Sequence, residues 1–338
     1  MLPLSLRNWI FDRWIQPDET LERVPWVTPG DLVFLPKLGL DVTRKFLRNF
    51  YIYRSNIKEN LKFSIAQFYP RSGYLIYYFF LFTWAEYYGV LPKLLEDPDL
   101  ALIPESFMRY VIEIDREIDT KRAVALLESD PTVISSHPWL SRFREQLWRT
   151  IERSSLSVDV RSLLLREISS FENTCRQVCY QNMIHPMHTL DGILTAKENT
   201  VGALFAAWNK LLNLVYEISP ENDPNSGQIF WNTGMALQML DDTVDVPIDL
   251  ENQTDNVFLC LVKENKAEWI ELEKYLQYLK TTPWKHLDTA WANQHAPHTL
   301  NRIREVGRNY LFRIKNDRPA TNELLWVMER LWFHAVGI

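Results

Sequence analysis

The most constraining feature of this 338-residue chain is a set of long segments that are poor in glycine and proline and repeat apolar residues every three or four positions. The clearest is 158–182, VDVRSLLLREISSFENTCRQVCYQN, with Ser157 before it as the expected N-cap. The same periodicity predicts further helices at 189–217, 228–246, 297–316 and 321–336. Alternating runs typical of strands are scarce, so the sequence predicts an all-α fold.

One large core accounts for these helices. Only 10 residues are glycine and 46% are hydrophobic, which argues against disorder. No linker or repeat divides the chain, so we expect a single domain over residues 1–338, with 1–50 as an N-terminal extension packed on the bundle. About ten or more helices with short connections predict a bundle, and bundle cores commonly hold ligand sites between facing helices.

Charge and cysteine content exclude several classes of function. The net charge of -6 offers no broad basic field, so nucleic acid is not an expected partner. Three cysteines and an N-terminus without a cleavage site predict a reduced, cytoplasmic protein. The most hydrophobic segment, 73–88, is too short for a stable membrane span and predicts a core helix. Serine-hydrolase, dinucleotide and phosphate-loop motifs do not occur.

A cluster of aspartates follows the apolar helical run GMALQML. Asp241 and Asp245 are four residues apart and share a helix face, with Gln238 one turn earlier. Carboxylates that end an apolar helix need a cation or hydrogen-bond donors, because isolated buried charge is costly. Asp249 continues the spacing, but Pro247 intervenes and weakens its claim as a ligand. The alternative is an acidic helix end entering a loop.

Two further segments carry charged residues that could bind a metal ion or a phosphate. Asp115 and Asp119, in YVIEIDREIDTKR, also share a helix face, and Mg²⁺ bridging would relieve their repulsion. The alternative is a solvated face with ordinary ion pairs. Lys197 precedes the small-residue run VGALFAAW and could supply a point charge for phosphate, or simply be an exposed lysine at a helix start.

Together these fragments resemble the isoprenoid synthase superfamily, which includes trans-prenyl diphosphate synthases, squalene-synthase-like enzymes and class I terpene cyclases. Gln238-Met-Leu-Asp-Asp-Thr-Val-Asp245 is similar to the family's Q-x-x-D-D-x-x-D, and Lys197–Phe205 resembles its lysine helix. Asp115–Asp119 stands where the first D-D-x-x-D would be, with Arg116 replacing the second aspartate. The resemblance implies an all-α bundle around a central apolar cavity, with a homodimer as a common state.

The departures from the family pattern favour one activity over its relatives. Where the family has the R-R-G that helps hold a second substrate, this sequence has Thr120-Lys-Arg-Ala123. A one-substrate cyclase, a carbon–oxygen lyase, is therefore expected to ionise a prenyl diphosphate and release diphosphate. A chain-elongating prenyl diphosphate synthase, a squalene-synthase-like coupling enzyme and a non-catalytic regulatory subunit remain alternatives.

The resemblance also implies roles for individual residues. Asp115, Asp119, Asp241 and Asp245 would be catalytic and, with Asp249, would ligate about three Mg²⁺ ions. Another set would contact the substrate's diphosphate or its prenyl chain: Lys197, Gln238, Arg122, Arg71, Arg308, Tyr310, Phe80 and Phe205. Any one aromatic in this set can equally be core packing.

Overall fold

The computed structural model describes residues 138–184, 189–219, 225–281 and 287–314, with scattered positions between 84 and 111. Within these residues every regular element is a helix and none is a strand, which confirms the all-α prediction for this part of the chain. No helix found there is both long and apolar enough to cross a membrane. The predicted helix at 321–336 and the extension at 1–50 lie outside the described residues.

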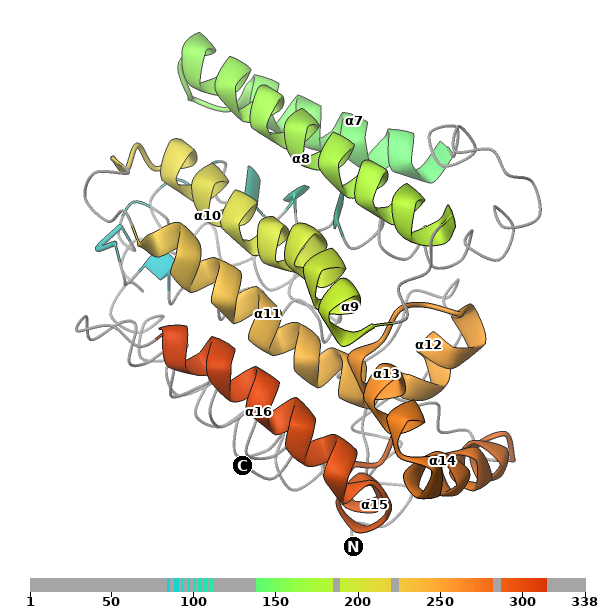
Figure 1. Cartoon of the computed structure of the whole chain (residues 1–338). Coiled ribbons are helices and arrows are strands. Elements are labelled where there is room, and N and C mark those ends of the chain that lie inside the picture. The colour runs from blue at the N-terminus through green and yellow to red at the C-terminus, as the bar shows by residue number, and fades with distance from the viewer. Residues whose placement is uncertain are drawn as a thin grey trace, which may run out of the picture.

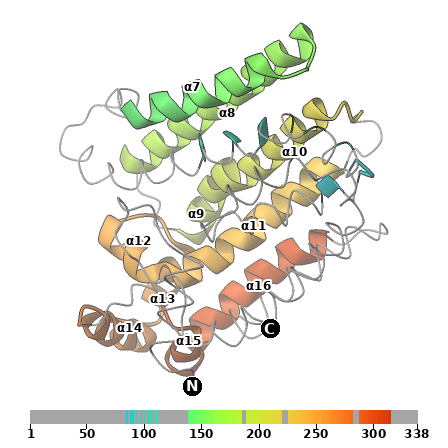
Figure 2. The ribbon, with the colours of Figure 1, turned by 180° about the vertical axis from the view of Figure 1, so that it is seen from behind.

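The long helices lie side by side across the molecule (Figure 1), and the view from behind shows the same order (Figure 2). In that order they are α7 (Pro138–Arg153), α8 (Val158–Ile184), α10 (Ala203–Val215), α11 (Ser226–Val244) and α16 (Pro297–Ile314). Four more helices gather where α11 ends and α16 begins. These are α12 (Val246–Asn252), α13 (Val257–Glu264), α14 (Lys266–Leu279) and α15 (Thr289–His295).

The helix boundaries follow the sequence signals closely. The Val160 amide donates to Ser157 Oγ at 3.3 Å, so Ser157 caps α8 as predicted. Helix α11 begins at Ser226, slightly before the predicted position 228. Side chains of α11 such as Met235 and Met239 are fully buried, which places this helix in the core.

The predicted helix at 189–217 contains a feature that periodicity does not reveal. Helix α9 (Leu190–Lys197) passes through a π-helical turn, η2 (Glu198–Gly202), before it continues as α10. The Thr200 hydroxyl donates to the carbonyls of Ala196 at 3.0 Å and Lys197 at 3.3 Å, which supports the backbone where the helical spacing changes. A π turn of this kind is frequent at functional sites, and here it follows Lys197 directly.

Helix α11 packs against the α9–η2–α10 segment through two glycines that each accommodate an aromatic ring from the other side. The Trp231 ring lies where a Cβ on Gly202 would project, at 2.5 Å, and the Phe205 ring lies 2.5 Å from the equivalent point on Gly234. Tyr310 of α16 then packs edge-on against Trp231, with ring centroids 5.9 Å apart. The two glycines therefore set how closely these helices approach.

We expect Gly234→Ala to destabilise the protein by about 1–3 kcal/mol, because the added methyl group overlaps the Phe205 ring and forces it from its rotamer. Gly227→Ala is the matched control on the same helix, since no atom lies within 4 Å of its Cβ position. That control should be neutral or slightly stabilising, as alanine favours helix over glycine. Urea unfolding of both variants measures the difference, and equal midpoints would contradict the packing argument.

The start of α16 is fixed by a side chain from another helix. Glu268 of α14 is buried and accepts hydrogen bonds from the amides of His298 at 2.7 Å and Thr299 at 3.0 Å. It also accepts from the Thr299 hydroxyl at 2.6 Å. A carboxylate at a helix N-terminus is favoured by the helix dipole, so Glu268 anchors α16 beside the end of α11.

Candidate functional site

The end of α11 carries the second aspartate motif. The Asp245 amide donates to the Asp241 carbonyl, and the Asp249 amide to the Asp245 carbonyl, each at 2.8 Å. The helical four-residue spacing therefore continues across the junction into α12, where Pro247 occupies the first turn of the new helix. Proline fits there because the first turn of a helix does not use its amides in intrahelical bonds. Pro247 therefore starts a second helix and keeps Asp249 in the same series.

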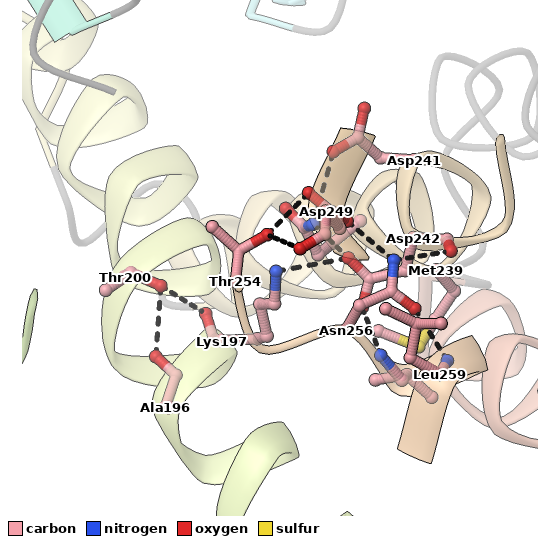
Figure 3. A network of polar contacts seen from close by, with 12 residues as sticks. Ala196, Lys197, Thr200, Met239, Asp241, Asp242, Asp249, Thr254, Asn256 and Leu259 are labelled. Carbon is pink, nitrogen blue, oxygen red and sulfur yellow. Dashed lines mark hydrogen bonds and ion pairs between the residues drawn. The ribbon is translucent and has the colours of Figure 1, made fainter. Parts of the chain in front are cut away.

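Asp242 is the anchored member of the motif and is fully buried. Its Oδ1 accepts from Lys197 Nζ at 3.1 Å and from Gln238 Nε2 at 2.6 Å, and its Oδ2 accepts from the Val257 amide at 2.8 Å. Three helices, α9, α11 and α13, thus meet on one carboxylate. Figure 3 shows Lys197 reaching across to Asp242 from the end of α9.

The Lys197 side chain is an integral part of this network. It is 18% exposed and forms an ion pair with Asp242. Burial alone would lower the pKa of its ammonium group, but the carboxylates of Asp242, Asp249 and Asp241 outweigh burial and raise the pKa. Lys197 therefore stays charged, and it is not the exposed lysine that the sequence left as an alternative.

Asp249 is held by two donors. Its Oδ1 accepts from Thr254 Oγ1 at 2.7 Å and its Oδ2 from Asn256 Nδ2 at 2.6 Å (Figure 3). Burial raises the pKa of Asp249 to about 6, and the Asp242 carboxylate adds to the rise, while Lys197 and the two donors oppose it. The carboxyl group therefore titrates close to neutral pH.

This raised pKa predicts a pH-dependent stability in the metal-free protein. A carboxyl with a higher pKa folded than unfolded binds its proton more tightly in the folded state, so its ionisation disfavours folding as pH rises from 3.8 through about 6. The free energy of unfolding of Asp249→Asn, taken relative to that of wild type, should therefore be about 1 kcal/mol higher at about pH 7.5 than at about pH 4.5. Thermal unfolding in EDTA at both pH values tests this, and a pH-independent difference between the proteins would contradict it.

Asp241 and Asp245 differ from Asp242 and Asp249, which are held by several hydrogen bonds. Asp241 is exposed and accepts one hydrogen bond, from Gln238 Nε2 at 3.3 Å, and Asp245 is partly exposed. Surrounding protein raises the pKa of Asp241, and the carboxylates of Asp245 and Asp242 raise it further against the effect of Lys197. The two groups form an accessible pair whose repulsion a cation would relieve.

The donor set suits a hard cation. Mg²⁺ prefers oxygen ligands and is commonly held by one or two carboxylates, with waters and substrate phosphates completing its shell. Among the residues that the structure describes, no group of three or more His, Cys, Asp or Glu side chains is gathered as a metal site. The carboxylates of Asp241 and Asp245 are accessible oxygen donors of the kind that Mg²⁺ prefers.

The other predicted site residues fall into two groups. Tyr310 donates its hydroxyl to Glu198 Oε1 at 3.1 Å, which joins α16 to the π turn, and Phe205 packs on Gly234 one turn before Gln238. Arg308 is exposed on α16. The remaining predictions lie outside the described residues, namely Asp115, Asp119, Arg122, Arg71 and Phe80.

Sequence reasoning missed the residues that organise the network. Asn256 precedes the apolar run VFLCLV, and this N-cap signal was readable from the sequence. The Asp242 contacts with Lys197 and Val257 join residues 45 and 15 positions apart, and the Thr254–Asp249 contact spans the turn after α12, so no local sequence pattern predicts them. Comparison of the chain with protein-family models, curated proteins and solved structures found no match in any of the three.

Proposed function

We propose that this chain is a Mg²⁺-dependent enzyme of the class I terpene synthase type, which ionises a prenyl diphosphate and releases diphosphate. The observation that carries the proposal is the accessible Asp241–Asp245 pair at the end of a buried apolar helix, beside a lysine held by Asp242. Such an arrangement suits a substrate with a charged head and an apolar tail. The finer architecture, a bundle enclosing an apolar cavity, belongs to the same proposal.

In this mechanism Asp241 and Asp245 would hold Mg²⁺ together with the substrate's diphosphate. Bound Mg²⁺ would neutralise the charge that develops on the departing diphosphate. The allylic C–O bond breaks, and its electron pair leaves with the diphosphate. Lys197 adds positive charge close to the accessible pair while Asp242 fixes its position. Asp242 uses one of the three N–H donors of the Lys197 ammonium group, and the positive charge of that group acts on the diphosphate.

Loss of diphosphate would leave an allylic carbocation on the prenyl chain, so the residues around the site would have to exclude water and stabilise that cation. Aromatic faces stabilise a nearby cation by roughly 0.5–2 kcal/mol each. Phe205 packs on Gly234 and Trp231 packs on Gly202, where α11 meets the α9–η2–α10 segment, and Tyr310 packs on Trp231. Burial, together with the Glu198 carboxylate, raises the pKa of Tyr310, so its hydroxyl stays protonated and keeps α16 bonded to the π turn.

The deciding experiment incubates the full chain with C10, C15 and C20 prenyl diphosphates, with and without Mg²⁺ and isopentenyl diphosphate. Diphosphate release and the hydrocarbon products are both measured. Mg²⁺-dependent release from a single substrate supports the cyclase. A requirement for isopentenyl diphosphate indicates chain elongation, and coupling of two identical donors indicates a squalene-synthase-like reaction. No Mg²⁺-dependent binding or release would reject catalysis of this type.

A further inference from the structure

Asn256 caps two helices with one side chain. Its Oδ1 accepts from the Leu259 amide at 2.9 Å and so caps the start of α13. Its Nδ2 donates to the Asp242 carbonyl at 2.7 Å, an acceptor in the last turn of α11. Carbonyls in the last turn of a helix lack intrahelical partners, so Asn256 satisfies one group at each helix end. Asn256 is itself only 2% exposed.

The same amide also reaches the acidic motif. Asn256 Nδ2 donates to Asp249 Oδ2 at 2.6 Å, and the next residue, Val257, donates its amide to Asp242 Oδ2 at 2.8 Å. Figure 3 shows Asn256 at the centre of these contacts, with Asp241 at their edge. The Asn256 side chain and the Val257 amide together thereby tie the last turn of α11, which presents Asp241, to α12 and α13.

We propose that Asn256 is a positioning residue for the cation site: it fixes the last turn of α11 so that Asp241 and Asp245 face the same ligand. This inference rests on the proposed function. Asn256 does not itself ligate the metal, because both ends of its side chain are bonded to protein groups. Removing such a supporting contact commonly weakens metal affinity 10–100-fold.

Asn256→Ser tests the proposal, since serine still caps a helix but cannot reach Asp249 or the Asp242 carbonyl. The matched control is Asn265→Ser. Asn265 caps α14, and its side chain accepts from the amides of Ala267 at 3.2 Å and Glu268 at 3.4 Å. Calorimetry measures binding of Mg²⁺ with inorganic diphosphate, and thermal unfolding in EDTA measures stability. We expect about tenfold weaker binding in Asn256→Ser and unchanged binding in the control.

A kinetic readout separates positioning from simple loss of structure. In Asn256→Ser the Mg²⁺ concentration for half-maximal diphosphate release should rise about tenfold, while the rate at saturating Mg²⁺ recovers. Wild-type affinity in Asn256→Ser would overturn the positioning role and leave the proposed function intact. Absence of binding by the wild-type chain would overturn both.

A measurement on the wild-type chain covers the case in which Asn256→Ser does not fold. The side-chain NH₂ resonances of Asn256, observed in protein labelled with ¹⁵N-asparagine, should shift when Mg²⁺ and diphosphate are added. Those of Asn265 should stay in place. An unmoved Asn256 signal at saturation would overturn the proposal.

Discussion

The double variant Asp241→Asn, Asp245→Asn is expected to lower Mg²⁺-dependent diphosphate release by about a thousandfold or more. These are the carboxylates of the accessible pair, and in the proposed mechanism their loss would remove the metal's protein ligands at the end of α11. Removing even one preorganised group that stabilises developing charge costs about 10²–10³ in rate. The assay follows diphosphate release from the prenyl diphosphate that the wild-type chain turns over fastest.

The same variant should be slightly more stable than wild type when no metal is present. The repulsion that raises the pKa of Asp241 disappears with the charges, and like charges four residues apart on a helix cost a few tenths of a kcal/mol. Lower activity with equal or higher stability separates a functional pair from a structural one. Glu251→Gln removes an exposed negative charge from α12 and controls for a general electrostatic effect of lost charge. It should leave diphosphate release unchanged. Undiminished release in the double variant would defeat the mechanism.

Much of the fold was readable because its determinants are local. The apolar periodicity and Ser157 predicted α8 to within a few residues, since capping and amphipathicity act over one or two turns. The π turn at Glu198–Gly202 was not predicted. The Trp231 ring of another helix packs on Gly202 in this turn, and apolar periodicity within the segment carries no information on such a tertiary contact.

The residues of the site could be predicted from the sequence, but not which of its aspartates face solvent and which are buried. Spacing grouped Asp241, Asp245 and Asp249 on one helix face, and the continued hydrogen bonds across the junction agree with that. It did not indicate that the neighbouring Asp242 turns inward to Lys197 and the start of α13. Adjacent residues on a helix point to different faces. Asp241 can therefore face a ligand while Asp242 forms hydrogen bonds inside the core.

The largest effect on stability is expected from Lys197→Met, at about 3–5 kcal/mol. The substitution leaves Asp242, which has no exposed surface, without its ammonium partner, and an uncompensated buried carboxylate is costly. Glu167→Gln provides the contrast. The Lys210–Glu167 pair also joins two helices, at 2.7 Å, but its lysine is 59% exposed, so its loss should cost less than about 1 kcal/mol.

A double-mutant cycle shows whether the loss comes from the pair itself. Asp242→Asn removes the charge and, because its new NH₂ group faces the Val257 amide or another donor, should also destabilise the protein. Lys197→Met combined with Asp242→Asn should then cost less than the sum of the two single changes, because no charge is left buried alone. Urea unfolding of the four proteins gives the coupling directly. Additive losses would mean that Lys197 and Asp242 are stabilised by other neighbours, and the ion pair would no longer explain how α9 is fixed to α11.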